Sequence, residues 1–208
     1  MEKPPPKHLS MIRSFVLADF VTLGNAFAGA GSILSAMQYL STHNIHFLYA
    51  VFVLLPVALV LDAADGRIAR WRHKSSPLGA DLDSLADVIS FGMAPAALAF
   101  AVGFRGGLDV AVLLYFVGCG ISRLARFNVT SAQLSDETGK VKYFEGTPIP
   151  SSLLLVAVIG VLSVMGKIDD NLPFGNVDLG PLSFHPLVVL YALSGSAMIS
   201  KTLRIPKI

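Results

Sequence analysis

Five aspartates lie close together in one stretch of an otherwise apolar chain: Asp62, Asp65, Asp81, Asp83 and Asp87. On a helix, residues three or four positions apart lie on the same face. The first two aspartates are three apart and the last two are four apart, so each pair would share a helix face. Asp81 falls on nearly the opposite side from Asp83 and is expected to be solvated or salt-bridged. The spacing therefore predicts two facing pairs of carboxylates.

Two kinds of chemistry fit these carboxylates. Four hard oxygen ligands from two helices suit a divalent cation such as Mg²⁺ or Mn²⁺. Alternatively, the acids lie at a surface and pair with the basic residues that follow the first pair, which are Arg67, Arg70, Arg72 and Lys74. A zinc site is not favoured, because the five histidines are scattered and Cys119 is the single cysteine.

Small residues beside the acids favour the cation site. Gly66 directly follows the first pair, Ala69 lies one turn further on, and Gly79 stands one turn before the second pair. Glycine within or beside a helix is costly, so it often marks the close approach of a backbone or a ligand. A cation that also holds a phosphate-bearing substrate needs this space, whereas a salt-bridged surface does not. Arg70 would then supply a guanidinium fork for phosphate.

The elements that must position these residues are apolar enough to span a membrane. Of the 208 residues, 53% are hydrophobic and 14% are charged, whereas an average soluble domain is about 25% charged. Six apolar segments approach the roughly 20 residues that cross a bilayer, and the fifth is the shortest: Phe15–Leu40, Ile45–Ala69, Gly79–Val102, Leu108–Val129, Pro150–Met165 and His185–Leu203. We therefore expect an all-α integral membrane protein with six transmembrane helices, forming a single domain over residues 1–208.

The basic residues indicate how the six helices are oriented. With these six spans, 14 of the 16 lysines and arginines fall on the same side of the membrane as the aspartates. Arg105 and Lys167 fall on the other side. Because basic residues accumulate in cytosolic loops, we expect both termini and the aspartates to face the cytosol. Residues 1–14 are expected to form a short interfacial helix on that surface. The net charge of +2 gives no reason to expect a nucleic-acid partner.

The spacing of the acidic and small residues matches a family signature. The pattern Asp62-x2-Asp65-Gly66-x2-Ala69-Arg70-x8-Gly79-x3-Asp83-x3-Asp87 resembles that of the CDP-alcohol phosphatidyltransferases at all eight positions. Four further tracts resemble the members of this family that use serine as the acceptor alcohol, particularly the fungal ones: LDSLADVISFG (82–92), RLARFNVT (123–130), YFEGTPIP (143–150) and SKTLRIPK (200–207). The likeness extends from Leu17 onward.

The resemblance implies a reaction and its cofactors. The phosphatidyl group of CDP-diacylglycerol would pass to the hydroxyl of L-serine, which gives phosphatidylserine and CMP. A two-metal site of Mg²⁺ or Mn²⁺ would be held by Asp62, Asp65, Asp83 and Asp87, and Asp87 would also act as the catalytic base. The family likeness further implies six helices, a homodimer surrounded by membrane lipids, and an active site facing the cytosol. The fungal likeness implies the endoplasmic reticulum membrane.

By the same resemblance, the CDP-diacylglycerol site includes Gly66, Ala69, Arg70, Ser76 and Gly79. Asn25, in an apolar helix, matches a position near the cytidine, and Thr22 one turn away is a weaker candidate. An isolated asparagine in such a helix could instead hydrogen bond a neighbouring helix. The glycines near Asn25, at positions 24, 29 and 31, are expected to serve helix packing.

A pair of arginines is the candidate site for the acceptor. Arg123 and Arg126 are three residues apart, so they share a helix face. A guanidinium binds a carboxylate at two points, and serine carries a carboxylate whereas inositol does not. We expect these arginines to hold the serine carboxylate, with Phe127 and Asn128 shaping the pocket wall. Alternatively, both arginines extend to lipid phosphates at the interface.

Two rival functions remain open at this point. The catalytic motif is shared across the family, so the acceptor could be inositol or glycerol 3-phosphate. An ion or proton transporter would also carry acids in its membrane helices. A transporter, however, is expected to place them near the bilayer midplane, often with repeat symmetry, and this sequence shows no repeat. Two further expectations are that Asp169, Asp170 and Asp178 form a solvated loop surface and that Cys119 serves packing.

Overall fold

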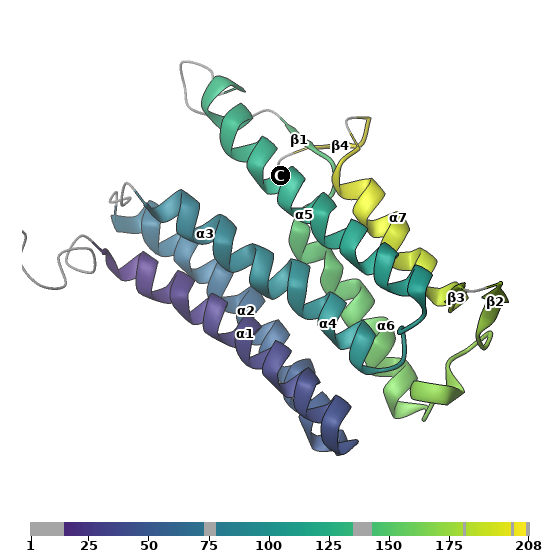
Figure 1. Ribbon diagram of the computed structural model, residues 1–208. Helices are drawn as coiled ribbons and strands as arrows, with labels where there is room; N and C mark the ends of the chain where they lie inside the picture. The colour runs from purple at the N-terminus through teal and green to yellow at the C-terminus, as the bar shows by residue number, and fades with distance from the viewer. Residues whose placement is uncertain (1–14, 73–77, 135–142, 181, 201, 207–208) are drawn as a thin grey trace, which may run out of the picture.

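The computed structural model describes residues 15–72, 78–134, 143–180, 182–200 and 202–206. The described chain forms a bundle in which long helices lie side by side (Figure 1). The interfacial helix predicted for residues 1–14 lies outside the described residues.

Four helices in the described part of the chain are long and apolar enough to cross a membrane. They are α1 (Leu17–Thr42), α2 (Ile45–Arg72), a continuous third helix over residues 79–101, and α5 (Gly107–Leu134). The third helix has three parts: α3 (Gly79–Asp87), the π-helical η2 (Val88–Met93) and α4 (Ala94–Ala101). The prediction of a helical membrane protein is confirmed at this level.

Two shorter apolar helices follow α5. The first joins the 3₁₀ turn η3 (Ile149–Ser152) to α6 (Leu153–Val164), and the second joins η5 (Pro186–Val188) to α7 (Val189–Met198). Each falls within 10–17 residues, below the roughly 20 that cross a bilayer in a straight helix. The sixth predicted segment, His185–Leu203, is longer than the helix in the structure, because α7 ends at Met198.

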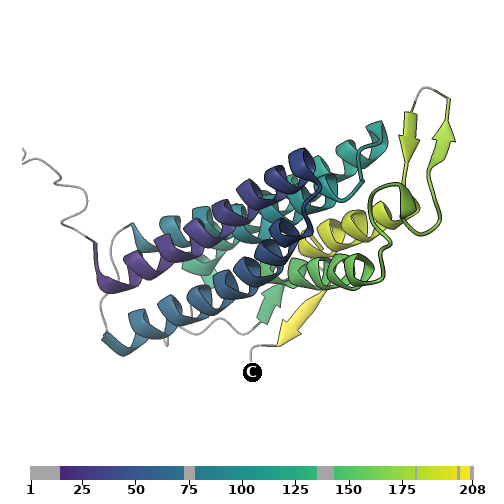
Figure 2. The same ribbon diagram turned by 90° about the horizontal axis from the view of Figure 1, so that it is seen from below.

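Short strands explain why α7 ends before Leu203, and the predicted all-α fold did not include them. Strand β4 (Arg204–Pro206) pairs antiparallel with β1 (Tyr143–Glu145), so the chain after α7 is extended rather than helical. A short 3₁₀ turn, η4 (Asp169–Asn171), and a hairpin of β2 (Val177–Leu179) and β3 (Leu182–Phe184) fill the connection between α6 and α7. Figure 2 shows this hairpin projecting from the end of the bundle opposite the start of α1.

The third helix lies between α1 on one side and α5 on the other (Figure 1). Its change to π-helical geometry at η2 falls just before Pro95. Proline has no N–H to donate, and its ring crowds the carbonyl four residues earlier. A wider turn at this point relieves that crowding, and π-helical turns often occur at functional sites. The helix therefore departs from regular α geometry directly after Asp87.

Helix α1 touches the third helix through a glycine. A Cβ added to Gly29 would lie 2.3 Å from Ser90 Oγ and 2.7 Å from Ser90 Cα. The Ser90 hydroxyl uses this approach to donate a 2.9 Å hydrogen bond to the Asn25 carbonyl of α1. The expectation that Gly29 serves helix packing is confirmed, and the contact sets the distance between the two helices.

We predict that Gly29→Ala destabilises the protein by about 1–3 kcal/mol, the usual cost of forcing an extra methyl group into a packed contact. Gly118→Ala in α5 is the matched control, because a Cβ there meets nothing within 4 Å. Thermal unfolding in detergent measures both variants. Equal unfolding temperatures for the two would show that the Gly29 contact is not tight.

Candidate active site

The predicted metal ligands lie in the half of the bundle where α2 ends and α3 begins (Figure 1). Carboxylate oxygens of Asp62, Asp83 and Asp87 all lie within 4.8 Å of one another. Asp87 is buried, and the other two are partly buried. Asp81 is exposed, as its position on the helix predicts. Three of the four carboxylates predicted to face each other therefore converge from two helices.

The fourth carboxylate, Asp65, lies outside that group of three. It is buried, and its Oδ2 accepts a 2.6 Å hydrogen bond from the hydroxyl of Thr22 on α1. The Thr22 hydroxyl also lies 3.1 Å from the Ala18 carbonyl of its own helix. Its single hydrogen can serve one of these acceptors at a time, and the shorter contact is with Asp65. Thr22 thus orients a carboxylate in this structure.

Asn25 connects α1 to Asp87. Its side chain is fully buried, and its amide nitrogen lies 3.4 Å from Asp87 Oδ1 as a donor. Its backbone carbonyl accepts the hydrogen bond from Ser90 described above. Its side-chain oxygen has no hydrogen-bond partner within the described residues. A buried acceptor without a partner is costly, so this atom is free for a ligand that donates a hydrogen bond.

The charge of the cluster favours a hard cation. Within the described ranges, no lysine or arginine forms an ion pair with Asp62, Asp83 or Asp87. Arg67, one of the basic residues proposed as a surface partner, is exposed. Three ionised carboxylates at this separation repel each other, and a nearby positive charge offsets that repulsion. Oxygen-only donor sets suit Mg²⁺, Ca²⁺ or Mn²⁺. The donor atoms present therefore fit a divalent cation.

Helix α5 brings two of the predicted acceptor residues to the same end. Arg123 is partly buried and interacts electrostatically with Asp87, and its guanidinium carbon lies 5.6 Å from the centre of the Phe127 ring. Asn128 donates a 2.9 Å hydrogen bond from its amide nitrogen to Ser84 of α3. Arg126 is exposed. The structure thus directs Arg123 and Asn128 toward the third helix.

Two serines of the third helix, which the sequence analysis did not predict as site residues, contact the neighbouring helices. Ser84 contacts Asn128 of α5, and Ser90 contacts Asn25 of α1. Each is three residues from Asp87, one before it and one after it, so their side chains flank that of Asp87 around the helix. That spacing within LDSLADVIS was the available signal, and it marks the points where neighbouring helices attach to the third helix.

The predicted donor-site residues are only partly described. Gly66 is partly buried near the end of α2, and Gly79 is the first residue of α3. Ala69 and Arg70 continue α2, but their side chains, like the whole of Ser76, lie outside the described residues.

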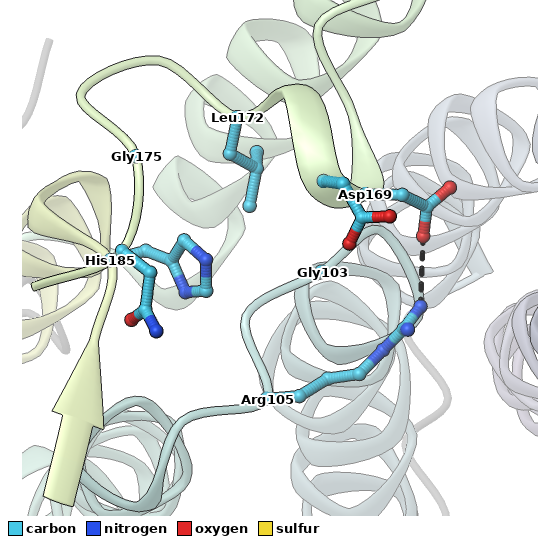
Figure 3. Close-up of a pocket in the computed structure, with 8 residues that line it drawn as sticks. Gly103, Arg105, Asp169, Leu172, Gly175 and His185 are labelled. Carbon is cyan, nitrogen blue, oxygen red and sulfur yellow. Dashed lines mark hydrogen bonds and ion pairs between the residues drawn. The ribbon is translucent and has the colours of Figure 1, made fainter. Parts of the chain in front are cut away.

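A separate pocket of about 290 Å³ opens at the other end of the third helix (Figure 3). Its lining includes Gly103, Arg105, Asp169, Leu172, Gly175 and His185. The prediction that Asp169 is simply solvated is wrong, because this carboxylate accepts hydrogen bonds from Tyr39 at 2.5 Å and Arg105 at 2.9 Å. The expectation does hold for Asp170 and Asp178, which are exposed.

A buried carboxylate also joins the loops at this end of the third helix. Asp109 is fully buried and accepts hydrogen bonds from the backbone N–H groups of Gly106 at 3.0 Å and His185 at 2.8 Å. Its Oδ2 lies 2.7 Å from Nδ1 of His185. Asp169 and Asp109 are therefore committed to joining loops to helices, and the converging carboxylates at the opposite end remain the candidate active site.

The fold and this site define a class of membrane enzyme. The chain matches the family model described as CDP-alcohol phosphatidyltransferase over residues 15–185, and it belongs to that family. Enzymes of this family transfer phosphatidyl groups and are generally dependent on divalent metal ions.

Particular relatives carry more specific names. The chain is 46% identical over 203 residues to the CDP-diacylglycerol–serine O-phosphatidyltransferase of Saccharomyces cerevisiae, covering 96% of this chain and 74% of that protein. It is 37% identical over 184 residues to the Helicobacter pylori protein of the same name, covering 86% and 70%. It is 38% identical over 151 residues to the archaetidylserine synthase of Methanothermobacter thermautotrophicus, covering 70% and 58%.

Cys119 is buried, as predicted.

We predict that Asp83→Asn removes the stabilisation that a divalent cation confers on the folded protein. Ligand binding at 100 times its dissociation constant contributes about 2.7 kcal/mol, so Mn²⁺ should raise the unfolding temperature of the unaltered protein. Asp81→Asn, two residues away and exposed, should retain the full rise. If Asp83→Asn gained as much from Mn²⁺ as the unaltered protein, the cluster would not be the cation site.

Proposed function

We propose that this protein transfers the phosphatidyl group of CDP-diacylglycerol to the hydroxyl of L-serine, forming phosphatidylserine and CMP. The observation that carries the proposal is the convergence of Asp62, Asp83 and Asp87 beside a partly buried arginine, Arg123. The names of the yeast and bacterial relatives support serine as the acceptor over inositol or glycerol 3-phosphate. The sequence shows no internal repeat, which also argues against a transporter, because transporter folds often have repeat symmetry.

The reaction makes one bond and breaks one bond at phosphorus. The serine hydroxyl oxygen attacks the phosphate attached to diacylglycerol, and the diphosphate P–O bond breaks so that CMP leaves with the bonding electrons. Asp87 takes the proton from the attacking hydroxyl, a role that typically contributes about 10²–10⁴-fold to the rate. The Asn25 amide, which donates to Asp87, holds this carboxylate toward the acceptor.

The same end of the bundle accounts for binding of the donor. Asp62, Asp65, Asp83 and Asp87 are the residues proposed to hold two divalent cations, Mg²⁺ or Mn²⁺. When bound, such cations neutralise the diphosphate and the departing CMP. Gly66, Ala69, Arg70, Ser76 and Gly79 are proposed to contact the nucleotide and diphosphate. The unpartnered Asn25 oxygen suits the exocyclic amine of cytosine, which is a hydrogen-bond donor, and Thr22 supports the site through Asp65.

The proposed setting is a eukaryotic membrane. We place six spans in the bilayer, adding the helices over residues 149–164 and 186–198 to the four long ones, with both termini and the active site in the cytosol. The bias of lysine and arginine toward the aspartate side supports this orientation. The likeness to the yeast enzyme supports the endoplasmic reticulum membrane, and the family likeness supports a homodimer.

An acceptor panel tests the proposed activity directly. Purified protein supplied with CDP-diacylglycerol and Mn²⁺ should release CMP when L-serine is added, and the lipid product should be phosphatidylserine. Inositol and glycerol 3-phosphate should give little release above the rate without acceptor. Release with either of these alcohols, and not with serine, would assign the protein to another branch of the family.

We predict that Arg123→Gln raises the KM for serine by about 10–100-fold, because a hydrogen bond to a charged group contributes about 1.5–3 kcal/mol. The KM for CDP-diacylglycerol should change much less. Arg126→Gln should have a smaller effect, since Arg126 is exposed. Initial rates over a range of serine concentrations measure both. If Arg123→Gln altered only stability or lipid dependence, this arginine would serve lipid phosphates instead.

A further inference from the structure

The tract Tyr143–Pro150 has no role in the reaction described above, yet the structure holds its second half firmly. After β1, Gly146 adopts a φ of 73°, and a Cβ there would lie 2.2 Å from the Met198 carbonyl oxygen. The Gly146 N–H donates to the Leu203 carbonyl at 2.8 Å, and the Thr147 N–H donates to the Ala197 carbonyl at 3.2 Å. The loop is therefore anchored to the end of α7.

Ile149, three residues after Gly146, packs between the third helix and α5. It is fully buried, and its Cδ1 lies 3.8 Å from the position of a Cβ on Gly92 and 2.9 Å from that of a Cβ on Gly120. Gly92 is five residues after Asp87, and Gly120 is three residues before Arg123. Ile149 therefore lies one π-helical turn below Asp87 on the third helix, and about 4.5 Å below Arg123 along α5 at 1.5 Å per residue.

Two hydroxyls of this loop are buried without partners. Besides Asn25 Oδ1, the buried side-chain polar atoms that lack a hydrogen bond in the described residues are Thr147 Oγ1 and Ser152 Oγ. Leaving such a group unsatisfied destabilises the folded protein. Of the three, Asn25 already contacts Asp87. An enzyme can retain a buried hydroxyl without a partner when a bound substrate supplies the missing hydrogen bond.

The position of Thr147 relative to Ile149 decides which hydroxyl faces the acceptor. Thr147 precedes Ile149 and bonds to α7 at Ala197, so it lies on the side of Ile149 toward the end of α7 and toward Arg123. Ser152 is three residues after Ile149 in the 3₁₀ turn, where residues three apart eclipse each other. Ser152 therefore lies deeper in the bundle, further from Asp87.

We propose that the Thr147 hydroxyl donates a hydrogen bond to the carboxylate of the serine acceptor, the same group that Arg123 binds. This inference rests on serine being the acceptor. Thr147 is then a specificity-determining residue, because an alcohol without a carboxylate leaves both its hydroxyl and the Arg123 guanidinium unpaired. The loop from Gly146 to Pro148 forms the wall of the acceptor site on the side of α7.

The test compares Thr147→Val, which keeps the shape and removes the hydroxyl, with Ser152→Ala as the matched control. Thr147→Val should raise the KM for serine at least tenfold and leave the KM for CDP-diacylglycerol unchanged. Without serine, its unfolding temperature should stay the same or rise, because the variant no longer buries an unsatisfied hydroxyl. Ser152→Ala should leave the KM for serine unchanged.

A double-mutant cycle with Arg123→Gln adds a readout that a structural role would not move. If both side chains bind one carboxylate, the double variant should raise the KM for serine by a factor different from the product of the two single factors. An unchanged KM in Thr147→Val, with wild-type turnover of serine intact, would overturn the role of Thr147 alone. CMP release by the wild type with another alcohol, and not with serine, would overturn the proposed function as well.

Discussion

Repulsion among three carboxylates is the constraint on which the rest of this structure depends. Asp62, Asp83 and Asp87 approach within 4.8 Å of one another inside an apolar bundle, and insertion of a charged carboxylate at the centre of a membrane helix costs roughly 2.5–3.5 kcal/mol. Such a group persists only if neighbouring elements hold it in place. The neutral donors Thr22 and Asn25 come from α1, and the positive charge of Arg123 comes from α5. The third helix is thus held from both sides.

The distance between α1 and the third helix follows from the same constraint. Asn25 can contact Asp87 because Gly29, one turn further along α1, lets the backbone of Ser90 approach. The Ser90 hydroxyl then fixes the two helices at that separation. On the other side, Ser84 and Asn128 join α3 to α5. Helix packing and site geometry therefore depend on small and hydroxylated residues spaced three apart around Asp87.

Much of this arrangement was predictable from the sequence, because it depends on local periodicity. The spacing of the aspartates predicted which side chains share a helix face, and hydrophobic runs predicted the helices to within a few residues. Contacts between distant segments were not predictable in this way. Asp169 was expected to be solvated, yet its partners Tyr39 and Arg105 come from other segments of the chain. The end of α7 was also misplaced, since the extended chain after it depends on β1, which is remote in sequence.

The pairing of β1 with β4 has a consequence for the order in which the enzyme is built. During synthesis, β1 emerges well before α6, the β2–β3 hairpin and α7, and its partner β4 emerges after all of them. The loop that follows β1 takes its anchoring hydrogen bonds from Ala197 and Leu203, which are likewise made late. The helices that carry the aspartates can be complete in the membrane while this loop is still unanchored. Assembly of the protein therefore ends with the pairing of β1 and β4 and the anchoring of the loop between β1 and α6.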